Sequence, residues 1–479
     1  MINFEDRQAV RFPRPLVLAA TIALVFAGCD SLLEVELPGS ITEDSLNDPS
    51  QATVLVSSAI ADIECAYSDL AATDAAGNED VFFRVTGWWG GAHEYRETPS
   101  TTNCNTTENA YGWYTPLHKG RYVAERAFAA LNEWEVENRE RLQAQAGIYA
   151  GVAYNVLGDY FCEVTADKGP LMSPDETLAK AEDYLTKALA NIQASGDFAI
   201  ADGEVTTSAR QMAHALRARV RFSRGPAHYA DALADAAEVQ EGFIAWVTRE
   251  ASGPRQRSNK VFSGNNENAY NTVNGVVTWW PLSNPQPIPF TGYRNLGILP
   301  DGRAVTDAGF AITTADAGAV ADPRVPVLDT GQTSNGHALW TQQKYTSRDS
   351  DIPLVKWEEV WLIRAEIEGG QTAIDLVNDI RAHHGLPLVT YLSASDAEGI
   401  ENLIIEERRR SLFLEARFWA TKIQHKDKLW FPRGRDFTPA GHAYRNAVRV
   451  VMPDNEFDLH PDLSLSQQGS MCGDEAPAA

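Results

Sequence analysis

The sequence predicts a mainly α-helical protein in which pairs of helices carry a loop-rich insert. Apolar residues recur at spacings of three and four along most of the chain, which is the period of an amphipathic helix. Three pairs of such segments resemble one another in length and in their content of small residues. Residues 251–355 interrupt this pattern with closely spaced Gly, Asn and Pro, which favour loops and short strands.

The N-terminus has the features of an export signal. Three arginines precede an apolar run from Leu16 to Ala27, and Gly28-Cys29 follow it. A helix of that length spans about 18 Å, too little for a hydrocarbon core of about 30 Å. The junction resembles a bacterial lipoprotein signal, so we predict a signal peptide over 1–28, lipidation of Cys29 by palmitate and related acyl chains, and a tether over 29–49. An ordinary secretion signal with a chance cysteine is the alternative.

The remaining cysteines form an even set, as expected for an exported chain that uses disulfides. We predict disulfides among Cys65, Cys104, Cys162 and Cys472, with all three pairings open. No spacing among them matches a zinc site, so no metal is predicted.

The helical frame can be followed in chain order. Asp48 can cap a helix that begins at Pro49. We expect helices over about 50–70 and 120–134, and helix pairs over 141–163 with 176–195, 207–224 with 227–241, and 356–368 with 371–385. Their small residues let two helices approach closely, as in tetratricopeptide repeats, although the spacing here is degenerate.

This pattern predicts a single domain over 50–479. Its helical frame covers about 50–70, 119–242 and 356–420. Its loop-rich ligand face covers about 71–118 and 251–355, since binding residues usually lie on loops that a rigid frame positions.

Charge and motifs exclude several functions. A net charge of −24 excludes a protein that tracks nucleic-acid phosphates. His93-Glu94 does not continue into a zinc-protease motif, and the segment 331–336 has P-loop spacing but His337 in place of the lysine. We therefore predict no catalytic residue and no cofactor. A hydrolase with its carboxylates in the two loop regions remains the alternative.

Aromatic side chains in the loop regions are the candidate ligand-binding residues. The twelve tryptophans include two adjacent pairs beside Gly- and Pro-rich segments. Flat aromatic faces can stack on the C–H faces of sugars. The predicted ligand-binding residues are Trp88, Trp89, Trp113, Trp279, Trp280 and Tyr293. The alternative is that these rings anchor the loops to the frame.

Two charged segments are interpreted as structural. The run Glu406–Arg410 lies on a predicted helix, where Glu406 and Arg410 are i, i+4 partners of a solvated or interhelical salt-bridge face. His383-His384 lies at a predicted helix end, where a positive charge interacts favourably with the helix dipole.

The order of several motifs resembles the SusD/RagB-like family of outer-membrane lipoproteins. The motifs are Leu32–Thr42, Ala61–Cys65, Asp322–Val325, Lys344-Tyr345, Asp351–Glu366, Ile380-Arg381 with Gly385–Pro387, Glu406–Arg409, and Met452–Pro461. Ser411 stands where the family usually has Glu, and Ala416 where it usually has Gly.

The resemblance implies a right-handed frame of four tetratricopeptide-like repeats with a loop-rich ligand face. It also implies a lipoprotein on the exterior of the outer membrane that captures glycans, or sometimes peptides, for a SusC-like TonB-dependent β-barrel transporter. No catalytic residue belongs to the family pattern. A surface-anchored hydrolase and a repeat scaffold that binds only protein remain the alternatives.

Overall fold

The computed structural model describes residues 47–76, 81–84, 112–251, 257–276, 290–305, 318–429 and 448–472. The chain divides between Asp48 and Pro49 into two units, and nearly all described residues belong to the second. The predicted signal peptide and Cys29 lie outside the described residues. The predicted tether does too, apart from its last residues, from 47 onward.

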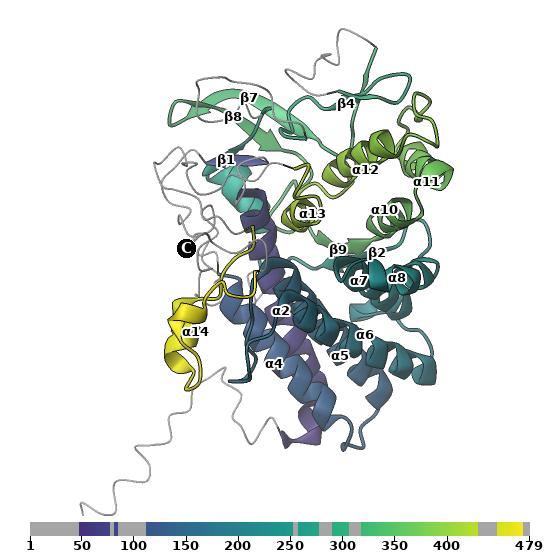
Figure 1. Ribbon diagram of the computed structural model, residues 1–479. Helices are drawn as coiled ribbons and strands as arrows, with labels where there is room; N and C mark the ends of the chain where they lie inside the picture. Colours follow the sequence, from purple (N-terminus) through teal and green to yellow (C-terminus); the bar gives the residue numbers. More distant parts are fainter. Residues whose placement is uncertain are drawn as a thin grey trace, which may run out of the picture. The chain divides into compact units, whose positions relative to one another are not determined.

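The second unit is mainly α-helical, as predicted (Figure 1). Its α-helices are α2 (Ala52–Ala76), α4 (Tyr114–Ala130), α5 (Arg139–Tyr160), α6 (Pro174–Ser195), α7 (Ala209–Ser223), α8 (Tyr229–Ala236), α9 (Lys260–Phe262), α10 (Trp357–Glu368), α11 (Gly370–His383), α12 (Ala397–Ser411), α13 (Phe418–Gln424) and α14 (Asp454–Leu459). Short 3₁₀ segments are η2 (Pro49–Gln51), η3 (Ala201–Gly203), η4 (Pro226–His228) and η6 (Leu465–Gln467), and a π turn is η5 (Ser263–Glu267).

The helices form a frame in which each packs against the next in chain order, from α2 and α4 through α8 to α10, α11 and α12. The three predicted pairs are confirmed as α5–α6, α7–α8 and α10–α11, and α2 with α4 forms a fourth. Local signals fix several starts. Ser173 and Glu176 form a capping box on α6, with Pro174 at its first position.

Two boundaries of the predicted ligand face are wrong. The loop expected from residue 71 begins later, because α2 continues to Ala76 and buries its last turns. The same loop ends earlier, because α4 begins at Tyr114. In both places buried packing extends a helix beyond the stretch that shows helical periodicity in the sequence.

Glycines on α5 allow this helix to lie very close to α6. A Cβ added at Gly151 would come within 2.6 Å of Leu185 Cγ, and one at Gly158 would come within 2.6 Å of Leu178 Cγ. Glycine in the interior of a helix weakens that helix. In the structure these glycines provide the space that the leucines of α6 fill.

Most of the described strands lie within residues 251–355, where short strands and loops were predicted, and the first two precede this insert. The strands are β1 (Phe82–Arg84), β2 (Ile244–Val247), β3 (Asn271–Val273), β4 (Gly297–Ile298), β5 (Ala304–Val305), β6 (Val320–Ala321), β7 (Val327–Ser334), β8 (His337–Gln342) and β9 (Ile352–Lys356). They pair antiparallel as β1–β3, β2–β9, β5–β4–β6 and β7–β8. The β2–β9 ribbon matters most here, because it joins the end of the second helix pair to the start of the third.

The charged run on α12 is buried, which corrects the solvated alternative. Glu407 is completely buried and pairs with Arg324 of the insert at 2.6 Å and with Arg381 of α11 at 2.7 Å. Arg410 is equally buried and pairs with Glu406 of its own helix and with Asp322 of the insert. The run therefore ties the insert to two helices of the frame, because buried charges need partners.

One predicted disulfide is present between Cys162 and Cys472. It joins the segment after α5 to the last described residues, 310 positions further along the chain. Cys65 is also disulfide-bonded. Cys104 lies outside the described residues.

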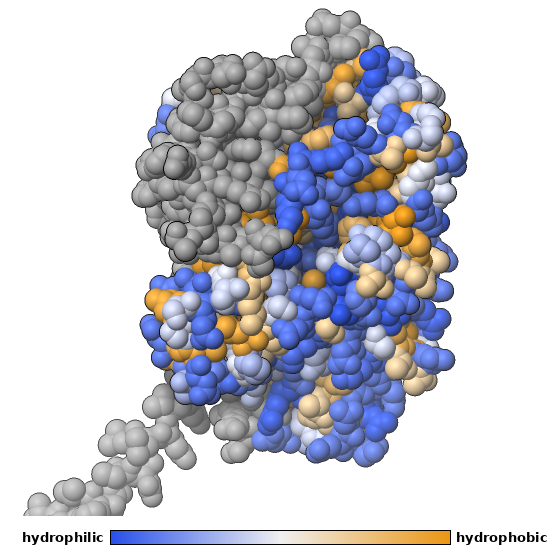
Figure 2. Space-filling view, viewed as in Figure 1, coloured by the Kyte–Doolittle hydropathy of each residue, from blue (hydrophilic) through white to orange (hydrophobic). Residues whose placement is uncertain are grey.

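None of the described helices has the length and apolar character needed to span a bilayer. The face shown in Figure 2 is largely hydrophilic over the helical frame, with hydrophobic residues scattered among polar ones. It is hollowed near its centre, where hydrophilic residues surround the hollow.

The close approach of α5 and α6 predicts that Gly151→Val destabilises the protein. Overpacking of this kind costs roughly 1–3 kcal/mol. The matched control is Ala190→Val on the exposed side of α6, which is expected to cost less than about 0.7 kcal/mol, the helix propensity of valine. Urea unfolding measures both free energies, and equal values for the two variants would contradict the packing argument.

Candidate functional site

A pocket of about 740 Å³ lies between the β2–β9 ribbon and the turn that joins α12 to α13. Its position matches the hollow in Figure 2, between α13 and the ribbon in Figure 1. The residues that form its walls come from six regions of the chain: Gly242, Ile244, Trp246; Pro323, Arg324, Pro326; Gln343, Lys344, Tyr345; Ser350, Asp351, Pro353, Lys356, Trp357, Glu358; His383, His384; and Ser411, Glu415.

The floor of the pocket is set by the alternation of side chains along β2. Ala245 and Val247 are buried in the core, whereas Ile244 and Trp246 are half-buried and line the pocket. Trp246 lies opposite Pro353 of β9, which also lines the pocket. The ribbon thus places a large aromatic ring in the wall of a cavity that charged side chains also line.

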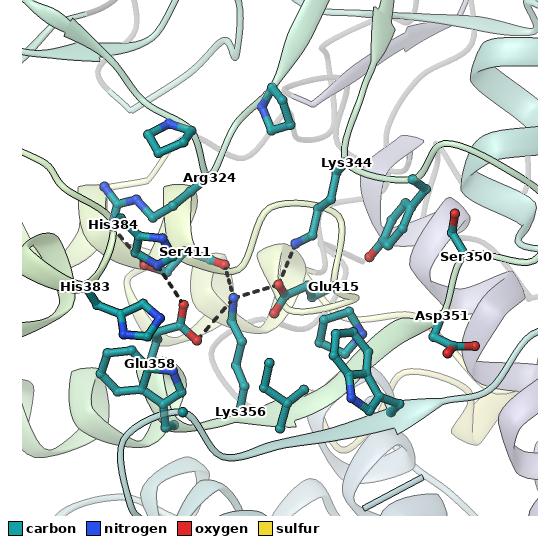
Figure 3. A pocket seen from close by; sticks show the side chains of 18 of the residues that line it. Arg324, Lys344, Ser350, Asp351, Lys356, Glu358, His383, His384, Ser411 and Glu415 are labelled. Atoms are coloured by element: carbon teal, nitrogen blue, oxygen red, sulfur yellow. Dashed lines mark hydrogen bonds and ion pairs between the residues drawn. The ribbon is translucent and has the colours of Figure 1, made fainter. Parts of the chain in front are cut away.

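Two lysines and two glutamates form a charged network on the inner wall (Figure 3). Lys356 pairs with Glu415 at 2.8 Å and with Glu358 at 3.4 Å, and it donates a hydrogen bond to the backbone oxygen of Ser411. Lys344 binds the same Oε1 atom of Glu415. Every lysine of this wall is therefore already paired with a carboxylate.

The environment of this network shifts the pKa values of its members. Burial by itself would raise the pKa of Glu358, but the charge of Lys356 and the hydrogen bond with His384 lower it to about 2. Burial lowers the pKa of Lys344 to about 8, although Glu415 favours its charged form. For Lys356 burial acts in the same direction, but Glu415 and Glu358 together raise its pKa.

The backbone turn beside the network is held in place by side chains from distant elements. The oxygen of Phe413 accepts a hydrogen bond from Lys344, that of Leu414 from Tyr345, and that of Ala416 from Tyr160. Ala416 has a φ of +57°, a conformation that glycine adopts without strain. This explains why the family usually has Gly at the position, and it shows that the hydrogen bonds hold the turn.

The motifs that carry the family resemblance meet at this wall. Arg324 of the Asp-Pro-Arg segment lines the pocket and also reaches Asp322, Glu407 and the hydroxyl of Ser411. Lys344 of the Lys-Tyr motif lines it as well. Because these contacts are internal, we assign the shared motifs to construction of the wall.

The predicted ligand-binding aromatics do not come together in the described residues. Trp113 is 1% exposed and packs on Tyr160 and Phe161. Tyr293 is also 1% exposed and stacks on Phe413. The expectation of an exposed ring is therefore wrong for both, because tertiary packing covers them.

The other four predicted aromatics, Trp88, Trp89, Trp279 and Trp280, lie outside the described residues. Their role as a sugar-stacking surface stays a prediction.

Trp246 is the residue that sequence analysis missed. A signal was present, since Ile244-Ala245-Trp246-Val247 follows Gly242 as a short strand after a helix. Four residues are too few for periodicity to separate the exposed face of a strand from its buried face. Only the pairing with β9 shows which side of the ribbon faces the pocket.

The remaining motifs behave as the sequence suggested. The segment 331–336 with P-loop spacing forms the end of β7 and an Asn335-Gly336 turn, with φ of +47° and +83°, before β8. Asn-Gly is typical of a two-residue hairpin turn, whereas a phosphate cradle leads into a helix. No group of three or more potential metal ligands occurs within the described part of the chain.

The two histidines lie at the end of α11, as predicted, and they also border the pocket. His383 is the last residue of the helix and contacts Glu241 at 2.9 Å. His384 contacts Glu358 at 3.0 Å.

No family model and no curated protein matches this sequence. Solved structures match its fold. A SusD homologue from Bacteroides thetaiotaomicron is 14% identical, with 92% of this chain and 99% of that chain covered and a TM-score of 0.58. Surface glycan-binding protein A from Bacteroides fluxus is 16% identical, with 90% and 99% covered and a TM-score of 0.57.

A laminarin-binding SusD-like protein is 16% identical, with 79% of this chain and 92% of that chain covered and a TM-score of 0.51. The chain thus has the SusD-like fold, which confirms at the level of the fold the class that the ordered motifs predicted.

The lowered pKa of Glu358 predicts loss of stability in acid. The stabilisation is present above the unfolded pKa of about 4.3 and is lost as the pH falls towards 2. Glu358→Gln removes this titration, so its free energy of unfolding should vary less steeply between pH 4.5 and 2, by up to about 1.4 kcal/mol per pH unit. Urea unfolding at several pH values measures this slope.

The control for that experiment is Glu398→Gln on the exposed surface of α12, which should keep the wild-type slope. If the unfolding free energy of Glu358→Gln kept the pH dependence of the wild type, the conclusion that Glu358 is buried and ionised would be contradicted.

Proposed function

We propose that this protein binds carbohydrate in the pocket above the β2–β9 ribbon. The observation that carries the proposal is the half-buried ring of Trp246 in a pocket of about 740 Å³ whose wall also carries charged side chains. Pockets of this size, with an aromatic surface and a few polar groups, suit small ligands. The fold supports it, since solved proteins with this fold include a laminarin-binding and a surface glycan-binding protein.

The charges of the pocket favour a neutral glycan. Its arginine and its two lysines, Arg324, Lys344 and Lys356, are bound to carboxylates of the protein itself. An acidic sugar would have to compete for them with buried partners, at the cost of leaving a charge unpaired. Asp351, which is exposed, offers a carboxylate that accepts hydrogen bonds from hydroxyl groups.

One carboxylate of this pocket, Glu358, does not suit the role of the acid in the alternative of a glycosidase. A glycosidase needs one carboxylic acid that keeps its proton near neutral pH. Glu358 has a pKa of about 2 and is therefore ionised at neutral pH. Turnover of an oligosaccharide by the purified protein would nevertheless decide for the hydrolase.

We further propose that the protein is lipidated at Cys29, faces the cell exterior and passes its glycan to a TonB-dependent transporter. The support is the lipoprotein-like junction before Cys29 and the order of the family motifs on a SusD-like fold. The loop tryptophans Trp88, Trp89, Trp279 and Trp280 would add a second stacking surface.

The carbohydrate proposal predicts that Trp246→Ala weakens binding of a neutral glycan at least roughly tenfold, since aromatic contacts dominate such sites. Binding is measured by affinity gels with laminarin, cellulose ethers, starch, mannan and xylan, and then by calorimetry. The matched control is Trp134→Ala, another half-buried tryptophan, which does not line the pocket. Unchanged binding in Trp246→Ala with loss in Trp280→Ala would move the site to the loops.

The transporter proposal predicts co-purification from the native outer membrane in mild detergent. The full-length chain, with its signal peptide, is expected to elute with a TonB-dependent transporter. The matched variant Cys29→Ala should be found in the soluble fraction, because it cannot carry the lipid. Recovery of the lipidated protein without a transporter would contradict the complex.

A further inference from the structure

A second cavity adjoins the pocket on the far side of Trp246. It has a volume of about 370 Å³ and lies between the start of α7 and the segment that follows α8. It shares Gly242, Ile244 and Trp246 with the first pocket. Each volume falls within the range of about 300–1,000 Å³ that holds small ligands.

Trp246 is fixed at the boundary of the two cavities by its backbone. Its N–H donates a hydrogen bond of 2.8 Å to the oxygen of Val205, next to Thr206 of the second cavity. The β2–β9 register is interrupted between Ala245 and Trp246. Trp246 therefore contacts both β9 and the loop before α7.

Side chains of the two cavities meet at one rim beside Gly242, which lines both cavities. A contact of 2.9 Å joins Glu241 of the second cavity to His383 of the first. Gly242 itself is exposed, and a Cβ added to it would have no heavy atom within 4 Å.

The second cavity carries groups suited to hydroxyl-rich ligands. Thr207, Gln211 and Gln240 supply hydroxyl and amide groups that donate and accept hydrogen bonds, whereas the buried hydroxyl of Thr206 is already hydrogen-bonded to the backbone of Ser208. The Gln211 side-chain oxygen accepts a hydrogen bond from the Gln240 backbone, which leaves its amide nitrogen as the donor. The one charged residue of its lining is Glu241, which His383 contacts.

We propose that the two cavities are subsites of one groove that crosses Trp246 and takes a neutral oligosaccharide of several sugar units. This inference rests on the carbohydrate function proposed above. The ring of Trp246 stacks on a sugar in the middle of the chain. The second cavity binds one end through Thr207 and Gln211.

The test is calorimetry of the full chain with di- to hexasaccharides of β-1,3-glucan, β-1,4-glucan, α-1,4-glucan, β-1,4-mannan and β-1,4-xylan. For the glycan that binds, affinity should rise at least tenfold from the disaccharide to the hexasaccharide. Thr207→Trp, which fills the second cavity, and Gln211→Ala, which removes its donor, should abolish most of that rise. Arg210→Trp, an exposed neighbour outside both cavities, should keep it.

Three outcomes separate the proposals. Loss of the length dependence in Thr207→Trp and Gln211→Ala, with the Arg210→Trp control intact, supports the groove. Hexasaccharide binding that needs Trp246 but is unchanged in both variants overturns the groove and keeps the single pocket. Binding of no oligosaccharide by the wild type overturns the carbohydrate function and the groove with it.

Discussion

A charge removed from water needs a partner where it is buried, and this constraint joins the insert to the helical frame. Glu407 of α12 has no exposed surface and holds Arg324 of the insert and Arg381 of α11. Removing one partner of such a group leaves an unpaired buried charge, which costs roughly 3–5 kcal/mol. These buried ion pairs therefore hold the insert in a single position on the frame.

The docking of the insert on the helical frame determines the shape of the pocket. Arg324 of the insert, Lys356 of β9 and the turn at Ala416 reach the same wall only when the insert is seated on α12. A second buried cluster, Glu359 with Arg219 and Arg417, fixes α10 to α7 in the same way. Ligand specificity is then left to pocket residues outside these clusters, among which Trp246 presents a half-buried ring.

The family motifs and the site thus have different physical roles. Arg324 and Lys344 of the ordered motifs are bound to carboxylates of the protein itself. Trp246 and Gln211 have partly exposed side chains, and neither belongs to one of the ordered motifs. A resemblance built on motifs therefore predicts the frame well and the ligand poorly.

The sequence by itself determined the helix pairs, the loop-rich insert and the SusD-like class, because apolar periodicity and motif order are local properties of the chain. It did not determine which side chains face a ligand. Trp113 and Tyr293 stand in loop-like sequence yet are buried by distant segments, and the run Glu406–Arg410 lies in the core. Trp246 becomes a site residue only when β2 pairs with β9. Burial depends on contacts between residues far apart in the chain, and those contacts exist only in the tertiary structure.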